Sequence, residues 1–188
     1  MNYDRAARTA HDAKILIAYF SVPESSGVDA VAQASRVVEN GEVVGNVEFI
    51  ASTIREETGG DIFAIETVQA YPGEHQALMD FAAAEMAANA RPELSTTINN
   101  LDDYDVIFIG YPIWWDEAPA MIATFLAEND FSGKVVAPFC TSSYSPIGNS
   151  LHIFRELASE AAIAEGLTAN DPSGIRPWVD QVMAQAEQ

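Results

Sequence analysis

Polar residues suited to binding an anion occur in two short stretches near the start of the chain. The first stretch, SVPESSG, begins at Ser21 and follows an apolar run at residues 14–20, and it contains no lysine or arginine. The second, GNV, comprises Gly45, Asn46 and Val47 and opens a helical pattern. Hydroxyl groups and free N–H groups at the amino end of a helix bind phosphate, because the helix dipole favours negative charge there. The two stretches therefore predict a phosphate site built from neutral donors.

Two placements of this phosphate site remain open. In the split site, Ser21, Val22 and Pro23 form one half and Gly45-Asn46-Val47 form the other, with a segment looped out between them. In the rival placement, Ser25-Ser26-Gly27 forms the whole site.

An aromatic pair and a hydroxyl-rich loop follow two later apolar runs. The stretch YPIWWDEAP, residues 111–119, contains Trp114 and Trp115, and aromatic side chains of this size give large stacking contacts. Either tryptophan alone can seal the core, but two in a row at a strand end favour a ligand contact for at least one. The stretch TSSYSPIGNS, residues 141–150, lets backbone groups approach a planar polar ring. Together these features predict a site for a phosphorylated, flat heterocycle, and flavin mononucleotide (FMN) fits best.

Five apolar runs predict the strands that position these loops. They cover residues 14–20, 61–66, 105–111, 134–140 and about 162–167. The first, third and fourth lack the alternation of a half-exposed strand, which is typical of parallel strands covered on both faces. Ligands of open parallel sheets bind at the carboxyl edge, so the three loops are expected to open onto one site.

Helical patterns separate most of these runs. The first expected helix runs from an Asn46 cap to Gly59-Gly60, and the second covers 75–90 with Leu78, Phe81, Ala82 and Met86 pointing inward. Two more are expected over about 118–128 and over 147–159. The last is expected to start near 176, with Pro177 in its first turn. The alternation predicts an α/β fold with a doubly wound sheet. One segment breaks it: Asn40-Gly41 lies between β-branched runs, which indicates an inserted β-hairpin at about 28–44. We expect a single domain over 14–188 after a loose leader at 1–13.

The composition narrows the class of protein. The formal net charge of −19 over 188 residues argues against nucleic acid and anionic membrane surfaces as partners. No apolar run approaches the roughly 20 residues needed to span a bilayer, and the start lacks the features of a signal peptide. The single cysteine, Cys140, excludes an internal disulfide. We therefore expect an acidic, cytoplasmic protein.

Several common sites are missing from the sequence. There is no G-x-G-x-x-G after a strand, no G-x-x-x-x-G-K-[ST] and no G-x-S-x-G elbow. His11, His75 and His152 lack ligand spacing, so no metal site is predicted. The acidic run at 102–105 precedes its strand and is expected to be a solvated turn. No side chain stands out as an acid or base, so no catalytic residue is predicted.

At these residues the chain resembles the flavodoxin-like family. The motifs that carry the resemblance are GYPIWW at 110–115, CTSSYSPIGNS at 140–150, NLDDYDVIF at 100–108 and DFSGK at 130–134. They are specific in combination, and the resemblance spans about residue 14 to the end. It implies a five-stranded sheet of order 2-1-3-4-5 in a three-layer sandwich, with FMN between strands one and three, a case long known for this fold.

The resemblance also implies which residues hold FMN. They are Ser21, Val22, Pro23, Gly45, Asn46, Val47, Pro112, Ile113, Trp114, Trp115, Asp116, Thr141, Ser142, Ser143, Tyr144 and Gly148. Two positions depart from the family pattern. Val47 replaces a threonine, which removes one hydroxyl donor at a cost of about 1 kcal/mol. Asp116 stands where relatives often have a glycine whose peptide can flip toward the flavin.

Three functions compete at this stage. The first is an electron carrier that uses FMN and a redox partner protein. The second is an FMN-dependent oxidoreductase that passes electrons from NAD(P)H to a quinone or another small acceptor, which needs a second cavity beside the ring. The third is a non-redox module that binds another flat ligand in the same pocket.

Overall fold

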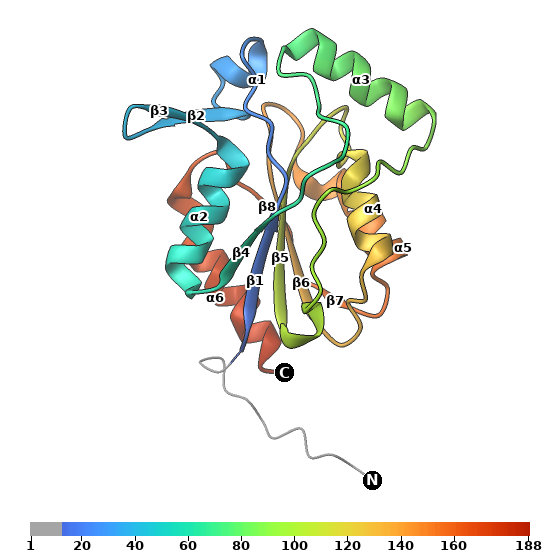
Figure 1. Ribbon diagram of the computed structural model, residues 1–188. Helices are drawn as coiled ribbons and strands as arrows, with labels where there is room; N and C mark the ends of the chain where they lie inside the picture. The colour runs from blue at the N-terminus through green and yellow to red at the C-terminus, as the bar shows by residue number, and fades with distance from the viewer. Residues whose placement is uncertain (1–12) are drawn as a thin grey trace.

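A six-stranded parallel sheet forms the centre of the protein in the computed structural model, which describes residues 13–188 (Figure 1). Its strands are β1 (Ile15–Tyr19), β4 (Asp61–Ala64), β5 (Val106–Pro112), β6 (Val135–Thr141), β7 (Ala162–Ile163) and β8 (Leu167–Thr168). The order is β4-β1-β5-β6-β7, with β8 also paired to β6. Every residue of β5 and β6 is buried, which explains why these runs show no alternation.

The sheet differs from the predicted five strands at one edge. Numbered along the chain within this sheet, β4-β1-β5-β6 has the expected order 2-1-3-4. The single strand predicted at 162–167 is instead two short strands, β7 beside Val135 and Val136, and β8 beside Phe139 and Cys140. Between these two strands, the Glu165 carbonyl accepts a hydrogen bond from the Trp178 indole.

Helices cover both faces of the sheet, as Figure 1 shows. On one face lie α2 (Asn46–Thr58) and α6 (Ile175–Ala186), and on the other lie α4 (Ala120–Glu128) and α5 (His152–Leu157). The helix predicted at 147–159 is a 3₁₀ segment, η3 (Ile147–Leu151), followed by the shorter α5. Two further 3₁₀ segments are η2 (Leu101–Asp103) and η4 (Pro172–Gly174). Across the described part of the chain, every helix is too short or too polar to cross a membrane.

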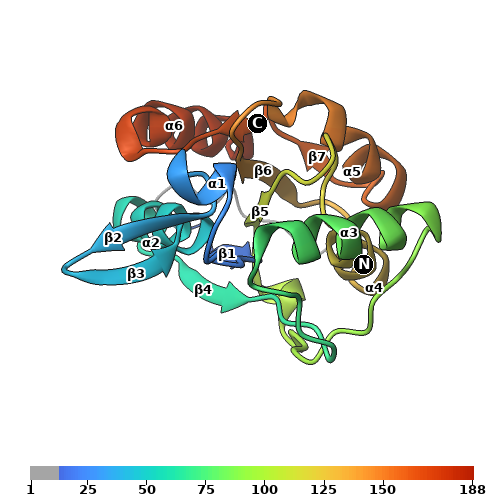
Figure 2. The ribbon, with the colours of Figure 1, turned by 90° about the horizontal axis from the view of Figure 1, so that it is seen from above.

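Helix α3 (His75–Ala87) lies across the carboxyl edge of the sheet beside the start of α4 (Figure 2). The Glu74 carboxylate caps it by accepting from the N–H groups of Gln76 and Ala77. Leu78 and Ala82 are buried as predicted. Met86 is 46% exposed, so its predicted inward position is wrong. The helix covers loops rather than the flat sheet, which leaves its C-terminal half without a core to face.

The segment between Ser21 and Gly45, here called the insert (22–44), holds a short helix as well as a hairpin. The helix is α1 (Val28–Val31), and the strands are β2 (Arg36–Glu39) and β3 (Glu42–Gly45). Asn40 and Gly41 have φ of 51° and 87°, as an Asn-Gly hairpin turn requires. The hairpin predicted at 28–44 therefore begins eight residues late, because the N–H groups of Ala34 and Ser35 fold back onto the Asp29 carbonyl.

The predicted leader falls almost entirely on residues 1–12, which lie outside the described residues, as does His11.

Candidate functional site

The two halves of the split phosphate site are in contact. β1 ends at Tyr19, and the chain returns at Gly45 after the insert. A Cβ atom added to Gly45 would lie 2.0 Å from Ser21 Oγ and 3.7 Å from Pro23 Cδ, so only glycine allows this approach. Ser21 Oγ is buried and has no hydrogen-bond partner among the described residues. A buried hydroxyl without a protein partner beside a helix start can bind a ligand or a water molecule.

The amino end of α2 supplies the second half of this site. Gly45 is the residue that precedes the helix, and Asn46 is its first residue, so the predicted Asn46 cap is wrong. The Asn46 side chain donates to the carbonyls of Gln33 (2.6 Å) and Asn170 (3.0 Å), and its N–H donates to the Ser35 carbonyl (3.0 Å). The insert thus occupies donors that a phosphate would otherwise use.

Val47 contributes no side chain to the phosphate site. It is 1% exposed and packs into the core beneath α2. Only its backbone can face an anion, which agrees with the loss of a hydroxyl donor at this position.

The rival placement at Ser25-Ser26-Gly27 is tied to the start of α3 instead. The N–H and hydroxyl of Ser25 both donate to the Gly73 carbonyl (2.8 and 3.1 Å), and the Ser26 hydroxyl donates to Glu74 (3.4 Å). Gly27 packs against the ring of His75. Both serine hydroxyls of this stretch are therefore engaged, whereas the Ser21 hydroxyl is not, which favours the split site.

The two adjacent tryptophans have different surroundings. Trp114 is 3% exposed and packs against Phe20 and Tyr71, with ring centroids 5.6 and 5.3 Å away. It is a core residue that also lines a cavity described below, and its predicted stacking on a flavin ring stays a prediction. Trp115 is 53% exposed, and its indole N–H donates to the Met79 carbonyl of α3 (2.8 Å). Of the pair, Trp115 has by far the more exposed ring.

The chain reverses direction between Trp114 and Glu117 in a tight turn. Its two central residues, Trp115 and Asp116, both have the left-handed conformation. Trp114 and Glu117 exchange two backbone hydrogen bonds of 3.0 Å, while Trp115 and Asp116 have φ of 51° and 68°. This is a type I′ pattern, which usually takes Asn-Gly. Each non-glycine residue there costs about 1–2 kcal/mol. Asp116 already has the backbone conformation that a glycine would allow.

Side chains of the third loop hold this turn in place. Asp116 binds Asn149, and hydrogen bonds from Ser145 and then Asn149 lower the pKa of the Asp116 carboxyl. Tyr144 is 82% exposed and lies in the same loop. Trp115 and Tyr144 are therefore the two exposed aromatic side chains among the predicted site residues.

Asn170, which follows β8, is a site residue that the sequence reasoning missed. Its amide accepts from the Ser142 N–H (2.9 Å) and donates to the Ser142 carbonyl (2.6 Å). The polar backbone of Ser142 is thus paired within the protein, and its predicted contact with a ligand ring stays a prediction. The only signal for Asn170 is its place in the turn-rich stretch NDPSG.

The remaining predicted residues line the walls of the site. Pro112 and Ile113 are buried at the end of β5, where the Ile113 N–H donates to the Thr141 carbonyl (3.0 Å). Thr141 is 1% exposed, and its hydroxyl has no partner in the described structure. Val22 packs on the core, Ser143 donates to Asp29, and Gly148 is exposed in η3.

The hydrogen-bonding groups at this edge suit FMN, but the cavity there is too small for it. The unpaired hydroxyls of Ser21 and Thr141 and the start of α2 suit a phosphate group and a polar chain. The cavity that Pro112, Ile113 and Thr141 share with the insert measures only about 10 Å³. That volume holds one water molecule or ion. A flavin at this edge therefore has to displace the insert or lie outside it, against Trp115.

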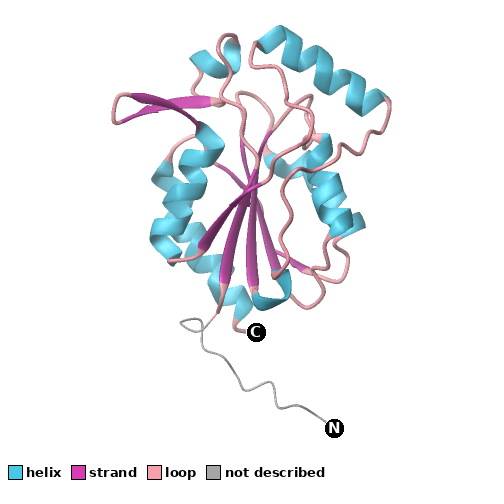
Figure 3. Cartoon of the chain, viewed as in Figure 1, coloured by secondary structure: helices cyan, strands magenta, loops and turns pink. Residues whose placement is uncertain are grey.

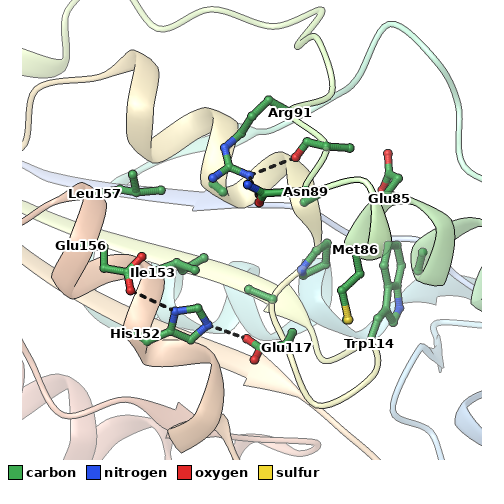
Figure 4. Close-up of a pocket in the computed structure, with 16 residues that line it drawn as sticks. Glu85, Met86, Asn89, Arg91, Trp114, Glu117, His152, Ile153, Glu156 and Leu157 are labelled. Atoms are coloured by element: carbon green, nitrogen blue, oxygen red, sulfur yellow. Dashed lines mark hydrogen bonds and ion pairs between the residues drawn. The ribbon is translucent and has the colours of Figure 1, made fainter.

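A larger cavity of about 280 Å³ lies on the other side of the Trp114–Glu117 turn, between α3, α4 and α5 (Figure 4). Its apolar wall includes Met86, Trp114 and Ile153. At its rim His152 binds Glu117 through Nε2 (2.9 Å) and Glu156 through Nδ1 (3.6 Å), and Arg91 donates to Asn89 (3.2 Å). The volume suits a small organic molecule.

Comparisons with known proteins agree with this fold. A model of the flavodoxin family, described as "Flavodoxin", matches residues 35–182. No curated protein matches the chain. A candidate flavoprotein from Bacteroides eggerthii DSM 20697 is 32% identical, with a TM-score of 0.72 over 90% of this chain and 98% of that one. Another, from Bacteroides uniformis ATCC 8492, is 26% identical, with a TM-score of 0.71 over 89% and 98%.

A third solved structure shows the fold alone. It is a flavoprotein in complex with FMN from Lactobacillus acidophilus NCFM, 22% identical, with a TM-score of 0.63 over 88% of this chain and 98% of that one. The family match covers most of the described chain, including α2, β5, β6 and the loops that follow them. The chain therefore belongs to the flavodoxin family.

Proposed function

We propose that this protein binds FMN at the carboxyl edge of its sheet and transfers electrons through it. Bound FMN supplies the electron-accepting ring, and the protein supplies binding, orientation and electrostatic surroundings. The observation that carries the proposal is the contact between Ser21 and Gly45, which brings an unpaired buried hydroxyl to the amino end of α2.

The chain's own residues have separable tasks in this proposal. Ser21 and the N–H groups that follow Asn46 in the first turn of α2 hold the phosphate. The Thr141 hydroxyl donates to the polar chain between phosphate and ring. Trp115 and Tyr144 cover the flat ring from the exposed side. Asp116 and Glu117 place negative charge beside it, which disfavours added negative charge on the ring and lowers its potential.

A second candidate function is an FMN-dependent oxidoreductase that uses NAD(P)H. The 280 Å³ cavity favours it, because the turn that carries Trp115 also carries Glu117, which lines that cavity. An acceptor bound there would lie on the far side of the Trp114–Glu117 turn from the proposed flavin position. A non-redox binding module would need the same edge but no electron donor.

Reconstitution with FMN tests the proposal. The purified full chain is mixed with FMN, desalted and examined for flavin absorbance and for quenching of flavin fluorescence. Stoichiometric, retained FMN with a perturbed spectrum is the expected result, and a folded chain that retains none would refute the proposal. Bleaching by NADPH alone then favours the oxidoreductase, whereas reduction only through a partner reductase favours the carrier.

A further inference from the structure

Glu24, Asp29 and His75 form a cluster of three potential metal ligands that the proposed FMN site does not use. They come from the loop after β1, from α1 and from the start of α3. One ligand atom from each lies within 4.8 Å of the other two. The closest pair is His75 Nδ1 and Glu24 Oε1, at 2.6 Å.

The cluster lies inside the protein rather than on the acidic surface. Glu24 is 1% exposed, and Asp29 and His75 are half-buried. His75 fits against the backbone of Gly27, where a Cβ would lie 2.3 Å from the ring, so the ring position is fixed by packing. Asp29 is oriented by the hydroxyl of Ser143. Three ligands held by their surroundings lose little side-chain freedom when an ion binds.

The negative charge of the cluster exceeds what its one imidazole can balance. Two carboxylates lie beside one imidazole, and within the described residues no lysine or arginine pairs with Glu24 or Asp29. Burial, and then the neighbouring charge of Asp29, raise the pKa of the Glu24 carboxyl, while the hydrogen bond from His75 opposes this. A divalent cation would offset both negative charges at once.

A second observation points to a ligand beside Glu24 and Asp29, two of the three residues. Glu24 and Asp29 line the 10 Å³ cavity beneath the insert, together with Thr141. The Thr141 hydroxyl is 1% exposed and has no hydrogen-bond partner in the described structure. A polar cavity of this size takes one water molecule or one ion, and an ion-bound water there would satisfy the hydroxyl.

We propose that Glu24, Asp29 and His75 bind a divalent transition-metal ion, with Zn²⁺ preferred over Mn²⁺ and both over Mg²⁺. A mixed nitrogen and oxygen ligand set suits Zn²⁺, whose bonds of about 2.0–2.2 Å put ligand atoms about 3–4 Å apart, so small side-chain rotations complete the site. The order of affinity follows from the usual order for such ligands and from the preference of Mg²⁺ for oxygen. The ion would hold the insert against α3.

Calorimetric titration of the metal-stripped full chain with ZnCl₂, MnCl₂ and MgCl₂, in moderate salt and without FMN, tests this. One Zn²⁺ per chain is expected. The substitutions His75→Gln and Asp29→Asn should each weaken Zn²⁺ binding by more than about 100-fold, since removing a group that only orients a ligand already costs about 10–100-fold. Zn²⁺ should also raise the unfolding temperature of the wild type but not of these variants.

The chain offers a matched control in His152. This histidine also contacts two carboxylates, but Glu117 lies at Nε2 and Glu156 at Nδ1, on different sides of the ring. His152→Gln should leave Zn²⁺ affinity unchanged. The proposal fails if the folded wild type binds no Zn²⁺, if His75→Gln and Asp29→Asn bind it like the wild type, or if His152→Gln abolishes binding. None of these results depends on whether FMN binds.

Discussion

The hydroxyl of Ser21 lies directly against Gly45, although the insert separates them in sequence, and a methyl group at Gly45 would come within 2.0 Å of Ser21 Oγ. This contact joins the end of β1 to the start of α2. It brings two incomplete sequence motifs together as the proposed anion site, which makes both residues direct targets for testing that proposal.

Gly45→Ala should weaken both folding and FMN binding. The added methyl has to push Ser21 away from α2, and such overpacking costs about 1–3 kcal/mol of unfolding free energy. Urea unfolding and FMN titration measure the two effects. Gly73→Ala is the matched control, because no atom lies within 4 Å of its added Cβ, and wild-type behaviour is expected. Equal effects of the two variants would contradict the assigned contact.

Ser21→Ala should separate binding from stability. It removes a donor to a charged phosphate, worth about 1.5 kcal/mol or more, so FMN affinity should fall about tenfold or more. Stability without FMN should not fall, since the Ser21 hydroxyl has no partner among the described residues. A stability loss without an affinity loss would place Ser21 in the core instead.

Truncation of Trp114 should mainly lower the free energy of unfolding, whereas truncation of Trp115 should mainly lower FMN affinity. Trp114→Ala opens a cavity next to Phe20 and Tyr71 and should cost about 3–5 kcal/mol of unfolding free energy. Trp115→Ala loses one exposed ring and one hydrogen bond, about 1 kcal/mol. It should nevertheless weaken FMN about two- to tenfold through lost stacking. Unchanged FMN affinity in Trp115→Ala would exclude this ring from the site.

Deleting residues 28–44 should preserve FMN binding. The deletion removes the Ser35 carbonyl that now takes the Asn46 N–H, and it uncovers the walls formed by Ile113 and Thr141. Affinity should therefore be equal to or higher than that of the full chain, as measured by fluorescence titration after circular dichroism has confirmed folding. A folded deletion variant that no longer binds FMN would show that the insert is part of the site.

Glu24→Gln should change how stability depends on pH. Burial first, and then Asp29, raise the pKa of the Glu24 carboxyl above its ordinary 4.5, so the folded protein holds this proton to higher pH than the unfolded chain. This contribution to stability is complete below pH 4.5 and is lost as the pH rises through the folded pKa. The unfolding free energy of Glu24→Gln minus that of the wild type should therefore increase with pH, as measured by urea unfolding without metal. A difference that stays constant would contradict the assignment.

The order of elements was predictable because it depends on local pattern. Continuous apolar runs at 106–112 and 135–141 require cover on both faces, and Asn40-Gly41 requires a hairpin turn. The extent of the hairpin was not predictable. Residues 28–31 form a helix through contacts with the third loop and α3, which the local sequence does not encode.

The roles of individual site residues depended on contacts between distant parts of the chain. Nothing in WWD tells which tryptophan is buried, because the choice depends on a turn with two left-handed residues of unfavourable type. In the sequence Glu24 is an ordinary loop carboxylate, and only the fold brings His75 of α3 into contact with it. Asn170 gains its role only when β8 lies beside β6.

Because Ser21 and Gly45 touch, the insert leaves and re-enters the domain at a single point. A segment whose two ends already meet adds little closure entropy when its length changes. We therefore expect the protein to tolerate insertion of another folded domain at this junction. An independently folding reporter with neighbouring termini, spliced there in place of the hairpin, would sit beside the ligand site without interrupting a strand of the main sheet.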